Sequence, residues 1–232
     1  MKVIHLFKRL RRAGVSVPLP ILASGRSIAR VIGVACSFWA LLTLPTIAHH
    51  AMGGALPQNG IEGFLSGLAH PVVGLDHLAF VIALGLLASL QSQGRWLPLV
   101  FLGAALAGTG LHLAGWNLLA SELMIATSVL LFGLMLAIKI PDWRMTLGLG
   151  AIAGLFHGYA YGEAIVGAGM APLVAYLVGF TVMQGAIALS AMGLATLIQR
   201  QVWNLSPLTF RFVGFMICGI GLTFLSNVLL SS

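Results

Sequence analysis

The sequence GLAHPVVGLDH, at residues 67–77, decides how the rest of the chain is interpreted, because it places ionisable side chains in an apolar run. It contains two imidazoles, His70 and His77, one carboxylate, Asp76, and one proline, Pro71. An Asp at the centre of a membrane helix costs about 2.5–3.5 kcal/mol on insertion scales, so such groups indicate a functional site. In a continuous helix His70 and His77 would lie on nearly one face, about 10 Å apart along the axis. Pro71 predicts a kink that would bring these donors closer together.

The composition excludes an ordinary soluble domain and indicates a polytopic membrane protein. Of the 232 residues, 59% are hydrophobic and 7% are charged, whereas soluble domains carry about 25% charged residues. The formal net charge of +7 does not indicate nucleic-acid binding, because seven of the twelve Lys and Arg residues lie within the first thirty positions. These seven are Lys2, Lys8, Arg9, Arg11, Arg12, Arg26 and Arg30. The two cysteines, Cys36 and Cys218, lie in separate apolar segments and predict no disulfide framework.

The first 48 residues are typical of a basic leader with a signal peptide. Residues 1–30 are basic and contain no acid, residues 31–47 are apolar, and the segment ending at Ala48 is a loose small-x-small cleavage signal. The alternative is an uncleaved anchor helix, because the basic part is unusually long. We therefore expect a leader at 1–48 and a membrane domain at 49–232.

The membrane domain contains six apolar stretches long enough to span a bilayer. They lie near Glu62–Leu90, Trp96–Leu118, Glu122–Ile140, Arg144–Tyr161, Ala171–Ile198 and Leu208–Leu230. The predicted fold class is thus an all-α membrane protein, a six-transmembrane-helix bundle. Alternate short loops carry the basic residues Arg95, Lys139, Arg144 and Arg200, and the loops between them carry none. By the positive-inside rule both mature termini lie outside the cytoplasm.

With this topology, the histidines and acids of the spans gather in the outer half of the membrane, apart from Asp142 in an inner loop. The candidate metal ligands are His70, Asp76, His77, His112, Glu122, His157 and Glu163. His112 and Glu122 have an equally simple interpretation as side chains at the membrane interface.

A short repeat links the first and fourth spans. Residues 67–70 and 154–157 share the pattern Gly-Leu-x-His, and each His precedes an acid by six residues. The two spans cross in opposite directions, as in an inverted repeat, and this predicts that they meet at a shared site.

Imidazole and carboxylate donors without thiolate suit a borderline divalent ion such as nickel, cobalt or zinc, and the residue types do not choose among these ions. A permease needs a site that binds well enough to admit the ion and weakly enough to release it. A few imidazoles and carboxylates meet that requirement better than a closed cysteine cage. The donor types therefore predict a site for a borderline divalent cation, and such a site would fit the need of a permease.

At these residues the chain resembles the HupE/UreJ family, bacterial membrane proteins regarded as nickel or cobalt permeases linked to hydrogenase or urease maturation. Residues 70–77 fit the family pattern HPxxGxDH at every fixed position, and residues 156–163 are close to FHGxAxGxE. Glu163 comes one position early, and Tyr161 stands where many members carry His. The acid that the family tends to carry in its third span would correspond to Glu122.

The resemblance implies a secondary permease in the bacterial inner membrane that takes up Ni²⁺ or Co²⁺, without a tightly bound cofactor. Nothing in the sequence resembles a nucleotide-binding loop, so no ATPase subunit is expected. Two other functions compete with transport. One is a zinc-dependent intramembrane hydrolase that uses the same His/Asp cluster, with Glu163 or Glu122 as the general acid or base. The other is a haem-binding membrane subunit with paired histidines on facing spans. The sequence favours transport over an enzyme.

Overall fold

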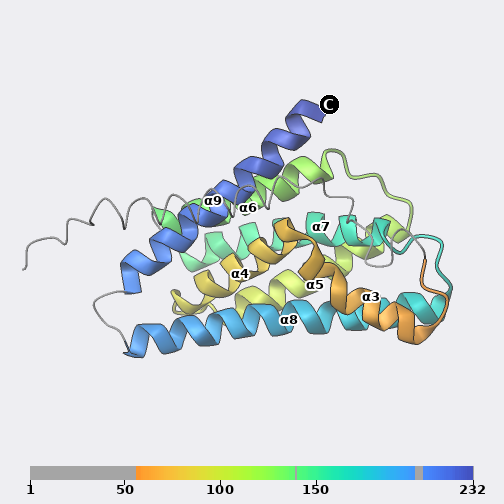
Figure 1. The fold of residues 1–232 in the computed structure, drawn as a ribbon, viewed down its shortest axis with the longest axis horizontal. Helices are drawn as coiled ribbons and strands as arrows, with labels where there is room; N and C mark the ends of the chain where they lie inside the picture. The colour runs from red at the N-terminus through yellow and green to blue at the C-terminus, as the bar shows by residue number, and fades with distance from the viewer. Residues whose placement is uncertain (1–55, 139, 202–205, 232) are drawn as a thin grey trace, which may run out of the picture. The chain divides into compact units, whose positions relative to one another are not determined.

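A computed structural model describes residues 56–138, 140–201 and 206–231 of the chain, and these residues form helices without any strand. The predicted leader and Lys139 lie outside the described residues. The helices are α3 (Gly60–Val73), α4 (Leu75–Ser89), α5 (Trp96–Leu113), α6 (Ser121–Ala137), α7 (Trp143–Glu163), α8 (Met170–Gln201) and α9 (Ser206–Ser231) (Figure 1). Each predicted apolar stretch contains helix, and the first contains two. The all-α class is therefore confirmed for the described part of the chain.

The first predicted span is broken at Gly74, where α3 and α4 meet at an angle of 77°. The expected kink at Pro71 was placed wrongly, because α3 continues through this proline to Val73. Gly74 has extended backbone angles (φ −74°, ψ 100°), which end one helix and begin the next. A Cβ on Gly74 would lie 2.8 Å from Cδ2 of His77 and 3.3 Å from Oδ1 of Asp76. The glycine therefore leaves room at the break for two of the predicted site residues.

Three helical segments among the described residues are long and apolar enough to cross a membrane: Trp96–Leu113, Met170–Leu197 and Leu208–Ser231. A fourth crossing results if α3 and α4 form one broken span. The sequence predicted six. The difference arises because α6 has only 17 residues, and because five glycines and several polar side chains dilute the apolar character of α7.

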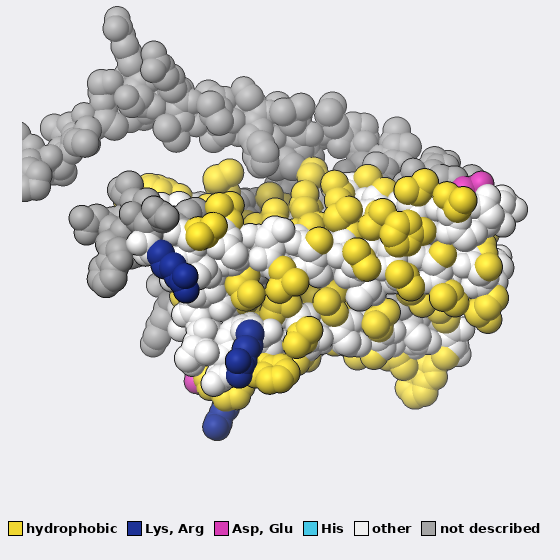
Figure 2. Space-filling model, turned by 90° about the horizontal axis from the view of Figure 1, so that it is seen from below, with side chains coloured by type: hydrophobic (Ala, Val, Ile, Leu, Met, Phe, Trp, Pro, Cys, Tyr) yellow, Lys and Arg dark blue, Asp and Glu magenta, His cyan; other side chains and the backbone are white. Residues whose placement is uncertain are grey.

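The charged side chains separate the two ends of the bundle. Arg95 precedes α5, Arg144 opens α7, Arg200 ends α8 and Arg211 lies near the start of α9; we call this the arginine end. Figure 2 shows arginine side chains gathered at one end of a face that hydrophobic side chains otherwise cover widely. Glu62, Glu122 and Glu163 lie at the opposite helix ends, which we call the acidic end. This distribution agrees with a bundle whose middle faces lipid.

An apolar core fills the bundle between the break at Gly74 and the arginine end. Its largest fully buried side chains come from α4, α5 and α6 and are Phe80, Leu84, Leu87, Leu97, Phe101 and Phe132. The core is closed at the arginine end by polar contacts: Gln91 Nε2 donates to Oγ1 of Thr146 (2.7 Å), and Arg211 Nε donates to the carbonyl of Ala137 (3.0 Å).

Glycines bring neighbouring helices into backbone contact. A Cβ on Gly108 of α5 would overlap the carbonyl oxygen of Leu155 in α7, and one on Gly158 of α7 would overlap that of Ala105 in α5. Small residues at such crossings let membrane helices approach closely, where van der Waals contact holds them together. The pairing of α5 with α7 therefore depends on these glycines.

We predict that Gly108→Ala destabilises the protein, whereas Gly110→Ala on the same helix does not. The added methyl at Gly108 forces α5 away from α7, and such overpacking costs about 1–3 kcal/mol. A Cβ at Gly110 meets nothing within 4 Å, and alanine favours helix over glycine by up to about 1 kcal/mol. Thermal unfolding of both variants in detergent measures the difference. Equal melting temperatures would contradict this packing.

Candidate metal-binding site

A polar pocket of about 330 Å³ lies at the acidic end of the bundle. It is bordered by the α3–α4 break, the start of α6 and the ends of α7 and α9. Five of the seven predicted ligands line it, together with further polar side chains of α6 and α9: His70, Asp76, His77, Glu122, Glu163, Ser121, Asn227 and Ser231. Within the described part of the chain, no three His, Cys, Asp or Glu side chains already stand in an arrangement that could hold a metal ion. The donors thus share a pocket without forming a closed cage.

Asp76 is held at the first turn of α4, where the helix break supplies a backbone donor. Its side chain is buried, and Oδ1 accepts a hydrogen bond from the backbone N–H of His77 (2.8 Å). Gly74, the residue before this helix, makes no side-chain cap for it. The N–H groups of a first helical turn lack partners within the helix and carry the positive end of its dipole. They stabilise the carboxylate at a depth where it would otherwise be costly.

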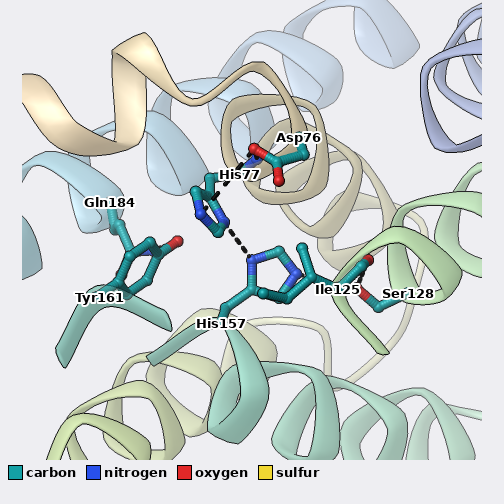
Figure 3. A network of polar contacts seen from close by, with 7 residues as sticks. All are labelled: Asp76, His77, Ile125, Ser128, His157, Tyr161 and Gln184. Atoms are coloured by element: carbon teal, nitrogen blue, oxygen red, sulfur yellow. Dashed lines mark hydrogen bonds and ion pairs between the residues drawn. The ribbon is translucent and has the colours of Figure 1, made fainter. Parts of the chain in front are cut away.

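A chain of hydrogen bonds joins the first and fourth predicted spans (Figure 3). Nδ1 of His77 lies 2.8 Å from Nδ1 of His157, and Nε2 of His157 lies 2.9 Å from Oγ of Ser128. The Ser128 hydroxyl donates its proton to the carbonyl of Ile125 (2.7 Å). The predicted meeting of these spans is therefore confirmed by a direct contact between their histidines.

The direction of this chain follows from the serine. A hydroxyl has one proton, and Ser128 gives it to Ile125. With its proton so placed, Ser128 accepts from Nε2–H of His157. With neutral imidazoles, Nδ1 of His157 then accepts from Nδ1–H of His77. The other ring nitrogen of His77, Nε2, lies 4.0 Å from Oδ1 of Asp76.

His157 lies behind the pocket and does not line it. It is fully buried, and both of its ring nitrogens are engaged, one by His77 and one by Ser128. Its ring also packs on Phe80, with ring centroids 4.3 Å apart. In this arrangement His157 orients His77, as residues behind a metal ligand commonly do. Its predicted role as a direct ligand stays a prediction.

His70 approaches His77 across the break. Their ring centroids are 5.9 Å apart, much closer than a continuous helix would place them. The ring of His70 also makes edge contacts with Tyr161 at 5.2 Å and Tyr176 at 6.0 Å. The break therefore brings the two histidines of one motif to a common pocket wall, as the sequence predicted for a bent helix.

The two predicted glutamates lie nearer the mouth of the pocket. Glu122 and Glu163 are exposed residues at the first turn of α6 and the last turn of α7. Both line the pocket, although Glu163 comes one position earlier than in the family pattern. The shift therefore does not remove this carboxylate from the pocket.

His112 is separate from the other candidates. It does not line the pocket, and it packs instead on Tyr159, with ring centroids 4.4 Å apart. Its Nδ1 is buried and has no hydrogen-bond partner among the described residues. A Cβ on Gly162 would lie 2.7 Å from Cβ of His112, so this histidine fills the contact between α5 and α7.

Sequence reasoning missed Ser128 and Gln184. Ser128 has no spacing signal, because it is a small residue within the apolar α6. Gln184 is an amide in the middle of the long α8, and an isolated polar side chain in a span is a recognisable signal. It is fully buried, and its Nε2 donates to the hydroxyl of Tyr161 (2.9 Å) (Figure 3).

Comparison with known proteins agrees with the motifs. The sequence profile of the family described as HupE / UreJ protein matches residues 37–224. Protein HupE of Rhizobium leguminosarum bv. viciae is 34% identical over 162 residues, which cover 68% of this chain and 81% of that protein. No solved structure matches the chain.

We predict that Ser128→Ala frees the ring protons of His157 and His77 to occupy either nitrogen. In the wild type, His157 should carry its proton on Nε2 and His77 on Nδ1, because Ser128 is an obligate acceptor in this chain of bonds. Without the hydroxyl, both tautomers of His157 become populated. Nitrogen-15 NMR of histidine-labelled protein distinguishes the two, with Ser226→Ala on α9 as the control. A wild-type His157 that lacks a proton on Nε2 would contradict the assignment.

Proposed function

The chain belongs to the HupE/UreJ family, and we propose that it is a secondary permease that carries Ni²⁺ or Co²⁺ across the bacterial inner membrane. The observation that carries the proposal is the shared pocket of His70, Asp76, His77, Glu122 and Glu163. The resemblance to permeases of hydrogenase or urease maturation supports the same function. The metal ion is the substrate here and not a resident cofactor.

The donor types in the pocket suit this substrate. Imidazole nitrogens and carboxylate oxygens bind borderline divalent ions, whereas Mg²⁺ and Ca²⁺ prefer sites made of oxygen alone. Cys218, the cysteine that the structure describes, does not line the pocket, so the described lining offers the ion no thiolate. A mixed site without thiolates favours reversible binding, which transport requires.

His77 and Asp76 form the proposed nucleus of the site. Nε2 of His77 lies 4.0 Å from Oδ1 of Asp76, so an imidazole nitrogen and a carboxylate oxygen stand close together at the wall of the pocket. A divalent ion about 2.0–2.2 Å from each would bridge them, and His70, Glu122 and Glu163 would complete its shell by moving inward.

We propose six crossings, with the α3–α4 pair counted as one. The helix ends support this count, because the arginines Arg95, Arg144, Arg200 and Arg211 all fall at one end of the described bundle. By the positive-inside rule that end faces the cytoplasm. The pocket and the mature termini would then face outward, where a cation arrives.

The pocket and the core suggest one state of a transport cycle. The pocket lies at the acidic end, while the apolar core separates it from the arginine end. An apolar core of this kind blocks an ion, since burying an unpaired charge among apolar side chains is very costly. Release to the cytoplasm would require this core to open, and the break at Gly74 is a suitable hinge.

We predict opposite accessibility for the two helix ends. The test places one cysteine at each end: Asn117→Cys in the α5–α6 loop and Gln93→Cys in the α4–α5 loop. Both Asn117 and Gln93 are exposed. In a background with Cys36→Ser and Cys218→Ser, a membrane-impermeant maleimide should label Asn117→Cys on intact spheroplasts. Gln93→Cys should react only after permeabilisation. The reverse labelling would overturn the proposed orientation.

The transport function predicts loss of uptake when the nucleus of the site is changed. In cells without their own nickel and cobalt importers, His77→Ala and Asp76→Asn should lower initial accumulation of radioactive nickel or cobalt at least tenfold, because each removes a proposed ligand. Asp142→Asn is the matched control. Asp142 caps α7 at the arginine end through Arg144 N–H, and asparagine caps equally well.

Matched membrane levels of each variant are required for this comparison. A wild-type protein that inserts normally and accumulates neither metal would contradict the transport function. Zinc-dependent turnover of a lipid or peptide would then favour the hydrolase that uses the same cluster.

A further inference from the structure

Behind the pocket lies a second polar cluster, formed by Tyr161, Tyr176 and Gln184. Their side chains are at most 1% exposed, and none of them lines the pocket. Nε2 of Gln184 donates to the Tyr161 hydroxyl (2.9 Å). Oε1 of Gln184 and the hydroxyl of Tyr176 are buried without a hydrogen-bond partner among the described residues. A buried polar group without a hydrogen-bond partner destabilises the fold, so two of them near one pocket require an explanation.

The cluster adjoins the histidines of the pocket. Tyr176, Phe180 and Gln184 recur every fourth residue and therefore share one face of α8. Tyr176 and Phe180 face His70, with ring centroids 6.0 and 6.4 Å away. The ring centroids of Tyr161 and His77 are 4.5 Å apart (Figure 3). The Tyr161 centroid also lies 5.2 Å from that of His70. The two histidines thus form a wall between the pocket and the cluster.

Beyond Gln184 the path toward the arginine end becomes apolar. One turn further along α8, Ala188 packs against Gly85 of α4. The next polar contact between these two helices is at the arginine end, where Nε2 of Gln199 donates to Oγ of Ser89 (3.2 Å). On the way from the pocket to the apolar core of the described bundle, Gln184 is therefore the last fully buried amide.

We propose that Gln184, Tyr161 and Tyr176 form a transfer site of neutral oxygens, which receives the divalent cation after the histidine pocket. This inference deepens the proposed permease function and rests on it. An amide or phenol oxygen carries no formal charge, and it suits nickel or cobalt less well than an imidazole nitrogen does, so these groups would hold the ion more weakly than the pocket. A structural role for Gln184 requires only its bond to Tyr161. The unpartnered Oε1 and Tyr176 hydroxyl need a further partner, and a passing cation supplies one.

The proposal predicts that changes in this cluster slow transport without weakening binding at the pocket. The test uses purified full-length protein for equilibrium dialysis with radioactive nickel, and the same protein in proteoliposomes for initial uptake. Gln184→Leu should keep the dissociation constant for nickel within twofold of wild type and reduce the uptake rate at least tenfold. Gln199→Leu on the same helix should leave both unchanged.

Tyr176→Phe is the second variant, because it removes one hydroxyl that has no hydrogen-bond partner in the described part of the chain, and it should fold normally. We expect a severalfold slower uptake with unchanged nickel binding. Uptake within twofold of wild type in both Gln184→Leu and Tyr176→Phe would overturn the transfer site, as would a parallel loss of binding and uptake. A wild-type protein that moves no metal would instead contradict the permease function itself.

Discussion

The burial of one carboxylate inside an apolar helix bundle is the constraint on which the rest of the site depends. In an unbroken helix every N–H near Asp76 would be bonded to the preceding turn, and the carboxylate would have no backbone donor. The break at Gly74 makes Asp76 a first-turn residue, so that the N–H of His77 bonds to Oδ1. The same break brings His70 within 5.9 Å of His77. One glycine therefore accounts both for the stability of the charge and for the gathering of the donors.

The orientation of His77 is fixed by residues that do not line the pocket. His157 holds His77 from behind, and His157 is in turn held by Ser128 and by the packing of α7. That packing is close, because a Cβ on Gly154 would lie 2.7 Å from the carbonyl oxygen of Phe101. The wall formed by α7 is therefore rigid, whereas the opposite wall ends at the break between α3 and α4. Any movement that closes or opens the site would be expected on the side of the break.

The sequence was sufficient to predict the helices and the residues of the main motif, because each depends on local pattern. The runs of apolar residues predicted helices at the observed places, and GLAHPVVGLDH predicted a bent segment with its donors close together. The bend itself was assigned to Pro71, although a proline three residues from a helix end is compatible with helix. Ser128, Gln184 and the separation of His112 could not be predicted, because each depends on how one helix is rotated against another. Spacing within a single helix does not determine that rotation.

The order of polar groups through the described bundle suits a protein that passes an ion on better than one that stores it. Carboxylates of Glu122 and Glu163 stand near the mouth, imidazoles and Asp76 form the inner wall, and the neutral oxygens of Tyr161 and Gln184 lie behind them. Coulomb attraction for a divalent ion falls along this order, because formal negative charge disappears from the ligands. A site that grew stronger with depth would trap the ion. In the proposed permease, attraction that is strongest at the entrance and weakest next to the apolar core would capture an ion from dilute solution and then hold it loosely enough for release.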